Sequence, residues 1–364
     1  MRFVFASYIF TEAYNDPESW IDRIKAYTGI MEALAQNNEV IRIEQINYEG
    51  KYKKNGVQYL FGRFKPEALF PSKLHDFIKS QKPDVVVIGS LHFPLQVIQL
   101  RLKLGKKVKI IVQNHAEKPY RGIKKILQKI ADRYINAYLF ASDELGVEWV
   151  VNGLISSARK VHEVMEVSSV FVPLGKVEAK AKTGVTGKPV FLWVGRLNDN
   201  KDPLTVVRAF LEYLLKNEHA KLYMIYHTDE LLPEIQRLIQ NSSQKEAIKL
   251  IGKVPHAELQ YWCNSADIIL SGSHYEGSGT AVCEAMSCGC MPIVTNIASF
   301  RMITNNGKCG LLYEPGNEKA LVAALEKTAT INVLEKQERS LRYFKANLSF
   351  EAIAKRFQKI SELL

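Results

Sequence analysis

The chain has 364 residues, of which 47% are hydrophobic and 24% are charged, as is ordinary for a globular protein with roughly two domains. No run approaches the roughly 18 apolar residues of a membrane span, and the first residues are too short an apolar run for a signal peptide. We therefore expect a cytoplasmic protein, and the net charge of +11 favours anionic partners.

Short apolar runs alternate with helical patterns along the first half of the chain. Strands are expected at residues 2–7, 40–46, 85–88, 108–113 and 138–141. Helices are expected at residues 20–37, 71–80, 94–104 and 120–136. This alternation is typical of layered α/β domains that are built around a parallel sheet.

The segment 101–133 is strongly basic, with eleven Lys and Arg residues against two acids. Such a patch attracts phosphate groups of any kind. Its second half repeats isoleucines and basic residues at helical spacing, so this helix could lie on an anionic membrane or pack on a core. Periodicity cannot separate these alternatives. We do not expect nucleic-acid binding, because no motif that reads nucleic acid accompanies the charge.

The segment 175–189 is rich in Gly, Lys, Thr and Ala and is predicted to be a linker. The alternation then restarts. Strands are expected at residues 190–194, 222–226, 248–251, 268–271 and 291–295. Helices are expected at residues 203–217, 230–241, 257–265 and 280–287. The second half is thus predicted to be another α/β layer structure with its own parallel sheet.

One stretch of the second half has the pattern of a phosphate site. The strand-like run 268–271 is followed by a turn and a helical pattern, and the turn residues are Gly277, Ser278, Gly279 and Thr280. Strand, glycine turn and helix start present bare backbone N–H groups to a phosphate. Glu284 falls in the first turns of that helix, where its carboxylate could accept hydrogen bonds from a ribose diol. Glu276 precedes the turn, where the other end of a nucleotide-sugar would lie.

Three motifs give the chain a family resemblance. Glu276 and Glu284 stand eight positions apart and are followed by the segment 285–294. Together, the two glutamates and this segment resemble the signature of retaining glycosyltransferases of family 4. The segments 194–204 and 250–259 resemble two further motifs of that family, and all three agree with it in order and spacing. One such motif alone would be weak, whereas three in register make a specific match.

The resemblance implies the GT-B fold, in which two Rossmann-like, doubly wound domains face a central cleft. We expect an N-terminal, acceptor-side domain at residues 1–176 and a C-terminal, nucleotide-sugar-binding domain at 177–346. The segment 347–364 resembles the terminal helix that crosses back to the first domain in this family. Because the implied groups are split between domains, we expect the domains to close over the donor.

The resemblance also implies roles for individual residues. Arg196 and Lys201 would grip the donor diphosphate, Val254 belongs to the loop that holds the nucleobase, and His115 resembles the family histidine beside the donor sugar. Glu276 would contact sugar hydroxyls or stand near the developing oxocarbenium charge. With two cations and the turn on the diphosphate, no metal or cofactor is required.

The chain departs from the family pattern after its first strand. Many members carry a pair of glycines there, whereas the loop 8–17 contains none and is aromatic and acidic. Either this loop is rebuilt for another donor or acceptor, or the sugar pocket is altered. His92 also follows a predicted strand and is a second histidine candidate, near the acceptor.

These features predict a retaining, metal-independent glycosyltransferase. It would move a sugar from a nucleotide-diphosphate donor to a glycan or lipid-linked glycan in surface polysaccharide synthesis, with the basic segment 101–133 on the inner face of the plasma membrane. The alternative is a catalytically weak GT-B protein that binds nucleotide-sugar or glycan as a partner subunit. An epimerase on the same fold would explain the paired glutamates less well. The nucleotide, sugar, acceptor, linkage and oligomeric state are left open by the sequence.

Overall fold

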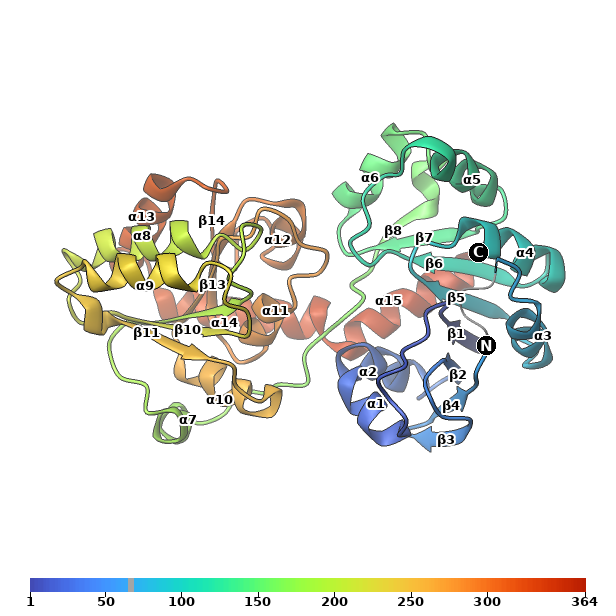
Figure 1. Cartoon of the computed structure of the whole chain (residues 1–364), viewed down its shortest axis with the longest axis horizontal. Helices are drawn as coiled ribbons and strands as arrows, with labels where there is room; N and C mark the ends of the chain where they lie inside the picture. The colour runs from blue at the N-terminus through green and yellow to red at the C-terminus, as the bar shows by residue number, and fades with distance from the viewer. Residues whose placement is uncertain (65–68) are drawn as a thin grey trace. The chain divides into compact units, whose positions relative to one another are not determined.

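The computed structural model describes residues 1–64 and 69–364, and over these residues the chain divides into two compact units. The first unit consists of Met1–Ser168 together with Phe350–Leu364, and the second consists of Ser169–Ser349. Each unit contains its own sheet with helices packed against it (Figure 1). The predicted fold class, two doubly wound α/β layer structures, is confirmed.

Within the described residues, the first sheet has eight strands in the order β3-β4-β2-β1-β5-β6-β7-β8. The strands are β1 (Arg2–Ala6), β2 (Glu39–Glu44), β3 (Gly50–Lys54), β4 (Val57–Phe61), β5 (Val85–Gly89), β6 (Lys109–Gln113), β7 (Ala137–Phe140) and β8 (Val161–Glu163). All neighbouring pairs are parallel except β3 with β4. The central strands are buried along most of their length, which explains why they appear in the sequence as continuous apolar runs.

The antiparallel hairpin β3–β4 was not among the predicted strands. Asn55 and Gly56 form its two-residue turn, with φ values of 48° and 84°. Two successive positive φ angles are what a type I′ turn requires, and Asn-Gly is the residue pair that favours it. The hairpin signal was therefore present in the sequence, and the outer strand β3 carries the lysines that protect an exposed edge.

The helices of the first unit include all those predicted, one of them broken in two, together with α6, which was not predicted. They are α1 (Pro17–Arg23), α2 (Lys25–Leu34), α3 (Ser72–Ser80), α4 (Pro94–Leu104), α5 (Gly122–Asp132), α6 (Asp143–Val151) and the 3₁₀ turn η1 (Ala158–Lys160). The predicted helix 20–37 is interrupted at Ile24, whose φ of −104° and ψ of 16° are not helical. The first piece starts earlier than predicted because Asp16 caps it, accepting a hydrogen bond from Ser19 N at 2.8 Å.

The final helix, α15 (Phe350–Leu363), belongs to the first unit. Its Phe357 packs against Phe3 and Phe5 of β1, with ring centroids 5.8 and 5.7 Å apart. Helix α15 also lies close to α2, since a Cβ at Gly29 would come within 2.6 Å of the Phe350 ring. The glycine thus permits the close approach of the two helices that cover this face of the sheet.

The second sheet, which lies wholly within residues 69–364, has six parallel strands in the order β11-β10-β9-β12-β13-β14. The strands are β9 (Val190–Gly195), β10 (Lys221–Tyr226), β11 (Ile248–Gly252), β12 (Ile268–Ser271), β13 (Met291–Thr295) and β14 (Leu311–Tyr313). Its core is formed by side chains of β9, β10 and α8, among them Phe191, Trp193, Phe210 and Met224. These residues are the apolar positions of the predicted strands and helix.

The second unit contains more helices than predicted. They are α7 (Lys176–Thr183), α8 (Pro203–Leu214), α9 (Leu232–Gln240), η2 (Lys245–Ala247), α10 (His256–Ser265), α11 (Thr280–Ser287), α12 (Ala298–Ile303), α13 (Glu318–Glu326), η3 (Lys327–Ala329), α14 (Val333–Tyr343) and the π-helical turn η4 (Phe344–Leu348). The prediction of a linker at 175–189 is wrong in its first part, where α7 forms. Lys and Ala favour helix, and Gly184, with a φ of 68°, ends it in the left-handed conformation.

Candidate functional site

Most predicted site residues lie on two loops at the topological switch point of the second sheet. Counted along the chain, this sheet has the 3-2-1-4-5-6 order of dinucleotide-binding folds, with β9 and β12 as central neighbours. The loop 196–202 follows β9, and the loop 272–279 follows β12. Ligands of open α/β sheets bind beyond the carboxyl ends of the strands at this point, so these loops form the candidate site.

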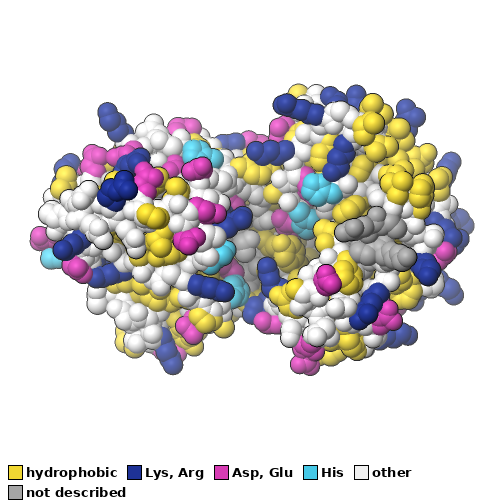
Figure 2. Space-filling view, in the orientation of Figure 1, with side chains coloured by type: hydrophobic (Ala, Val, Ile, Leu, Met, Phe, Trp, Pro, Cys, Tyr) yellow, Lys and Arg dark blue, Asp and Glu magenta, His cyan; other side chains and the backbone are white. Residues whose placement is uncertain are grey.

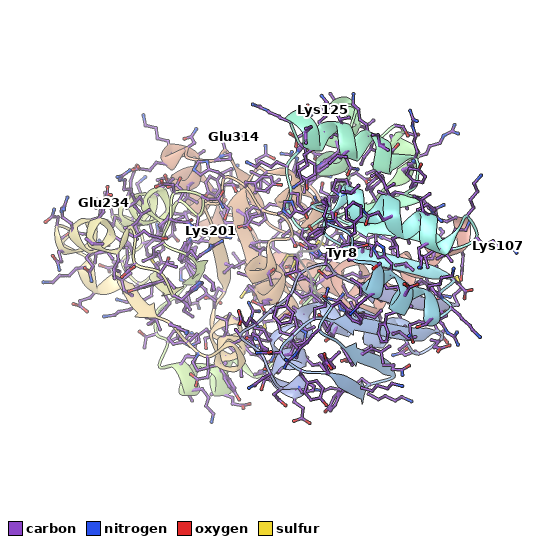
Figure 3. All side chains as sticks on the ribbon, turned by 45° about the vertical axis from the view of Figure 1, so that its right-hand side comes forward. Tyr8, Lys107, Lys125, Lys201, Glu234 and Glu314 are labelled. Atoms are coloured by element: carbon purple, nitrogen blue, oxygen red, sulfur yellow. The ribbon has the colours of Figure 1, made fainter. Side chains whose placement is uncertain are left out.

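Side-chain contacts join the two loops. Lys201 Nζ forms an ion pair with Glu276 Oε1, which also accepts a hydrogen bond from Ser273 Oγ at 2.7 Å. Asn200 Nδ2 donates to the carbonyl oxygen of Tyr275 at 3.0 Å. The structure therefore brings Lys201, labelled in Figure 3, into direct contact with Glu276, although 75 positions separate them in sequence.

The backbones of the two loops also approach closely. A Cβ at Gly272 would lie 2.8 Å from the carbonyl oxygen of Asp202, so a larger residue would push the loops apart. Asp202 has a φ of 42° and caps helix α8, and its carboxylate lies 3.3 Å from His274 Nε2. A left-handed residue other than glycine costs about 1–3 kcal/mol and is typical of functional loops. Asp202 lies within the motif segment 194–204 and His274 stands two residues before Glu276, but neither was assigned a role from the sequence.

The turn that precedes α11 leaves the N-terminus of this helix open. Gly279 holds the cap position with a φ of 58° and supplies no side-chain cap. A Cβ there would come within 2.8 Å of the Phe300 ring, so glycine is required by both backbone and space. The buried Ser278 and the exposed Thr280 flank it. Gly279 thus gives no side-chain cap to the first two N–H groups of α11, those of Thr280 and Ala281, and such groups can bind an anion. Val282 N and Cys283 N donate to the carbonyl oxygen of Gly279.

Arg196 follows β9 directly and is exposed. Among the residues that the structure describes, its guanidinium forms no hydrogen bond or ion pair. Lys201, by contrast, is neutralised by Glu276. The site thus holds one available planar cation and one cation that a ligand would have to share with a carboxylate, next to an open helix N-terminus. These groups suit the oxygens of a diphosphate.

Glu284 lies on α11 and is 5% exposed. Its Oε1 lies 2.6 Å from His256 Nε2, and the His256 ring packs on Phe171 with centroids 4.9 Å apart. His256 is the first residue of α10 and follows the short loop that contains Val254. The imidazole of His256 therefore connects Glu284, the predicted ribose ligand, to the loop of Val254, which is predicted to hold the nucleobase.

His256 was not assigned a role from the sequence, although it lies within the motif segment 250–259. A histidine inside a family motif, directly before the predicted helix 257–265, was an available signal. Its partner Glu284 is 28 positions away, and that pairing becomes visible only when α10 and α11 pack together. The pair fixes the orientation of the Glu284 carboxylate in the ligand-free protein.

His115 lies in the first unit, just beyond β6. Its Nδ1 contacts the carboxylate of Glu166, which is 8% exposed at its side chain. Burial lowers the pKa of His115, but the hydrogen bond and charge of Glu166, together with the charge of Glu117, outweigh burial and raise the pKa above its usual value. The imidazole forms part of the wall of a pocket of about 230 Å³ at the carboxyl ends of the central strands of the first sheet.

Glu117 organises the two loops that end β5 and β6. Its carboxylate accepts hydrogen bonds from Ser90 Oγ at 2.6 Å, Leu91 N at 3.0 Å, Asn114 Nδ2 at 2.8 Å and His115 N at 2.5 Å. These bonds hold Ser90 in the left-handed region, with a φ of 82°. This role was not predictable from the sequence, because a single Glu inside a basic segment is typical of a surface residue.

Over residues 1–64 and 69–364, no group of three or more His, Cys, Asp or Glu side chains is placed so that it could hold a metal ion. Over the same residues, no helix has the length and apolar character needed to cross a membrane.

A doubly wound sheet with cations and a helix N-terminus at its switch point is typical of α/β proteins that bind phosphorylated ligands. Residues 176–346 match the family described as glycosyl transferases group 1. The matched segment contains both loops of the candidate site together with Val254, His256 and Glu284.

Curated relatives include other glycosyltransferases. The D-inositol 3-phosphate glycosyltransferase of Arthrobacter sp. (strain FB24) is 26% identical over 152 residues, which cover 40% of this chain and 36% of that protein. The UDP-Gal:alpha-D-GlcNAc-diphosphoundecaprenol alpha-1,3-galactosyltransferase of Escherichia coli is 28% identical over 48% of this chain and 44% of its own length. The chain thus spans less than half of these relatives in alignment.

Structural similarity extends over the whole chain. The crystal structure of a glycosyltransferase from Rickettsia africae ESF-5 has a TM-score of 0.76, with 17% identity, and the match covers 100% of this chain and 97% of that one. Identity this low shows the fold alone. The expected resemblance to family 4 and the GT-B fold is confirmed.

Proposed function

We propose that this protein is a retaining, metal-independent glycosyltransferase that transfers a sugar from a nucleotide-diphosphate donor to a glycan or lipid-linked glycan in surface polysaccharide synthesis. The observation that carries the proposal is the contact between Lys201 and Glu276 beside the open N-terminus of α11. Cations and backbone N–H groups converge there on one position that suits a diphosphate. The match of this segment to that family supports the same reaction class.

In this proposal, the second unit stabilises the leaving group. Arg196 binds phosphate oxygens through two N–H groups, and the first turn of α11 adds its N–H groups and dipole. Lys201 moves from Glu276 to the diphosphate as negative charge develops on it. The bond between the sugar C1 and the phosphate oxygen breaks, the bond from C1 to the acceptor oxygen forms on the same face, and the departing phosphate takes the acceptor proton. Glu276 is then available for sugar hydroxyls.

The remaining predicted residues position the donor. Glu284 accepts hydrogen bonds from the ribose diol. His256 keeps the carboxylate of Glu284 aimed toward the loop of Val254, and this loop contacts the nucleobase. His115, oriented by Glu166, donates a hydrogen bond to a hydroxyl of the donor sugar. The family resemblance implies these roles, and the local contacts of the residues are compatible with them.

The test is a thermal-shift screen against UDP-, GDP- and ADP-sugars with a chelator present, repeated on Arg196→Ala. A ligand that binds only the folded state raises the melting temperature by mass action. One nucleotide class should stabilise the wild type and fail to stabilise the variant. If that class binds but no transfer or hydrolysis of the sugar can be measured, the partner-subunit alternative replaces the enzyme. If no nucleotide-sugar stabilises a well-folded sample, the donor site itself is wrong.

We also propose that helix α5 holds the protein on the inner face of an anionic membrane, near a lipid-linked acceptor. Ile123, Ile126 and Ile130 recur at helical spacing and are 77%, 58% and 40% exposed. Hydrophobic and basic side chains gather over the region of α4 and α5 in Figure 2, and Figure 3 shows Lys107 and Lys125 projecting outward from the first unit. Apolar anchors flanked by lysines favour an anionic lipid surface.

Part of the basic segment does not contribute to this surface. Arg101 is 7% exposed, and its guanidinium donates to the carbonyl oxygens of Tyr134, Gly105 and Val108. Only the exposed basic residues of the segment 101–133 can therefore contribute to a membrane-binding surface.

Co-sedimentation with phosphatidylglycerol vesicles tests the membrane proposal. The double variant Ile126→Glu, Ile130→Glu should lose binding, whereas Val177→Glu, which changes an 86% exposed aliphatic residue on α7, should keep it. Equal sedimentation of both variants with the wild type would contradict the role of α5.

A further inference from the structure

A second pocket of the first unit, which we call the basic pocket, has a volume of about 250 Å³ and lies between the end of α5 and the loop after α6. Helix α5 leads into β7, and Lys160 directly precedes β8, so this pocket lies at the amino ends of these strands. His115, in contrast, follows the carboxyl end of β6. The wall of the basic pocket consists of three cations, one acid and three loop residues: Lys129, Arg133, Lys160, Asp132, Gly153, Leu154 and Ser156.

A buried polar network forms the floor of the basic pocket. Asp132 is 3% exposed, and its Oδ1 accepts a hydrogen bond from Tyr138 Oη at 3.1 Å and lies 3.2 Å from Lys160 Nζ. Its Oδ2 accepts from Ser156 N at 3.2 Å. Gln128 Nε2 donates in turn to Tyr138 Oη at 3.0 Å. The carboxylate is therefore held by the fold, and the charge of Lys160 already matches it.

Two cations of the wall have no such partner. Lys129 and Arg133 are exposed at the end of α5, and within residues 1–64 and 69–364 neither side chain forms a hydrogen bond or an ion pair. The ammonium group of Lys129 lies over the loop, since a Cβ at Gly153 would be 3.7 Å from Lys129 Nζ. Three cations and one carboxylate leave the wall with a net charge of +2. Such a pocket attracts phosphate groups, whose oxygens suit the planar fork of an arginine.

Exposed aliphatic side chains flank the basic pocket on both helices. Ile126 and Ile130 on α5 are 58% and 40% exposed, and each stands three positions before one of the two unpartnered cations, on the same helix face. Val147 and Val151 on α6 are 46% and 80% exposed, and Val151 ends this helix two residues before Gly153. A free phosphate gains nothing from aliphatic neighbours. The arrangement therefore favours a phosphate that is attached to an apolar chain.

The charge of the basic pocket distinguishes between two classes of lipid phosphate. A phosphomonoester carries about two negative charges above neutral pH, whereas a phosphodiester such as that of phosphatidylglycerol carries about one. Only the monoester balances both unpartnered cations. It also leaves all its terminal oxygens open to the two cations and to the exposed hydroxyl of Ser156, whereas the second substituent of a diester occupies one of these oxygens.

We propose that the basic pocket binds the terminal phosphate of a lipid phosphomonoester, so that the first unit recognises a headgroup in addition to surface charge. The inference rests on the membrane-binding part of the proposed function. Arg133 binds the phosphate through its guanidinium N–H groups, and Lys129 contacts it as a point charge. Lys160 stays on Asp132 and adds its field. The isoleucines of α5 and the valines of α6 contact the apolar part of the bilayer.

Vesicle flotation of the full chain at mildly alkaline pH tests the inference. One set of phosphatidylcholine vesicles contains phosphatidic acid, and the other contains twice as much phosphatidylglycerol, so that the surface charge of the two sets is the same. The wild type should bind the phosphatidic acid vesicles at least about threefold more tightly, because two further charged contacts form in the pocket. Equal binding to the two sets would overturn the inference.

Two double variants assign the preference to the basic pocket. Lys129→Gln, Arg133→Gln should lower the ratio of the two affinities to about one, and it should keep the melting temperature because both side chains are exposed and unpartnered. Lys106→Gln, Lys125→Gln removes the same charge outside the pocket; Lys125 is labelled in Figure 3. This control should weaken binding to both vesicle sets and keep their ratio. The same ratio in both double variants would overturn the assignment.

Inorganic phosphate distinguishes a lipid from a free anion. If it raised the melting temperature of the wild type but not of Lys129→Gln, Arg133→Gln, and the vesicles showed no preference, the pocket would bind free phosphate and the lipid inference would be overturned. The preference for phosphatidic acid, abolished in that variant, is the result that supports the lipid.

These outcomes are separate from those of the proposed function. If both vesicle sets bind equally well and Ile126→Glu, Ile130→Glu abolishes binding to both, the headgroup inference is wrong and the membrane role of α5 stands. If neither vesicle set binds, the membrane proposal is wrong and the headgroup inference falls with it. The nucleotide-sugar screen tests the donor site independently of either result.

Discussion

The two units have the same kind of sheet and the same switch-point layout, yet the residues at that point are chemically opposite. In the second unit, exposed Arg196 and the bare N–H groups of α11 offer positive potential to a ligand. In the first unit, the mostly apolar pocket beside His115 holds cations that are already paired with Glu44 and Glu166. The comparison shows that sheet topology fixes where a ligand binds, whereas loop residues decide which ligand it is.

The largest effect is expected when a cation is removed from the candidate site of the second unit. Arg196→Ala should lower the turnover of sugar transfer by about 10²–10³-fold, because a fixed donor to the developing charge is lost. Lys201→Ala should have a similar effect and should also free Glu276. Steady-state kinetics with the donor from the screen measures both. Lys216→Ala, an exposed lysine paired with Glu326 on the same unit, is the matched control and should be neutral.

A large effect on stability is expected in the first unit. Glu117→Ala should lower the free energy of unfolding by about 2–3 kcal/mol, because several buried hydrogen bonds to a charged group are lost together. Urea denaturation measures the change. The exposed Glu148 on α6 is the control, and Glu148→Ala should change stability little. Equal effects of the two variants would show that the carboxylate of Glu117 does not hold the loops.

An intermediate effect is expected at the nucleoside end of the second unit. Glu284→Ala should weaken donor binding about tenfold or more, since charged hydrogen bonds contribute roughly 1.5–3 kcal/mol. His256→Ala should raise the donor KM by a smaller factor and leave kcat nearly unchanged, because His256 acts only by orienting Glu284. Turnover that falls as far in His256→Ala as in Arg196→Ala would contradict a positioning role.

The smallest expected effect is on the pH dependence of stability. The pKa of His115 is raised in the folded protein, so its pairing with Glu166 adds stability that is fully present below pH 6.5 and is lost as the pH rises through the folded pKa. Between about pH 6 and about pH 9, the wild type should therefore lose more stability than Glu166→Gln. Parallel pH profiles for the two proteins would show that the pair is not charged when folded.

The sequence predicted local features of the site well and long-range features poorly. The turn before α11 and the placement of Arg196 after a strand follow from short patterns, because a strand, a glycine turn and a helix are decided by neighbouring residues. The partners of His115 and Glu284 are 51 and 28 positions away, so they depend on how distant elements pack. The pocket beside His115 draws on β1, β2, β5 and β6 and was not predictable for the same reason.

Helix α5 shows another limit of periodicity. Its isoleucines and its buried residues both recur at helical spacing, so the pattern alone did not reveal which side faces the core. In the structure Gln128 and Ala131 are buried, whereas Ile123 and Ile126 are exposed. From hydrophobicity alone, the isoleucines would be expected to face the core and Gln128 to face solvent. The exposure of the isoleucines is therefore the observation that the sequence pattern could not provide.

Hydrogen exchange on the full chain, with the nucleoside diphosphate that the screen identifies, tests the donor site most directly. We expect slower exchange of the amides at 277–282 in the second unit, because the diphosphate binds the first turn of α11. Exchange around β1 and β5 at the pocket of the first unit should stay unchanged. Protection at the first-unit pocket with none at 277–282 would contradict the assignment of the donor to the second unit.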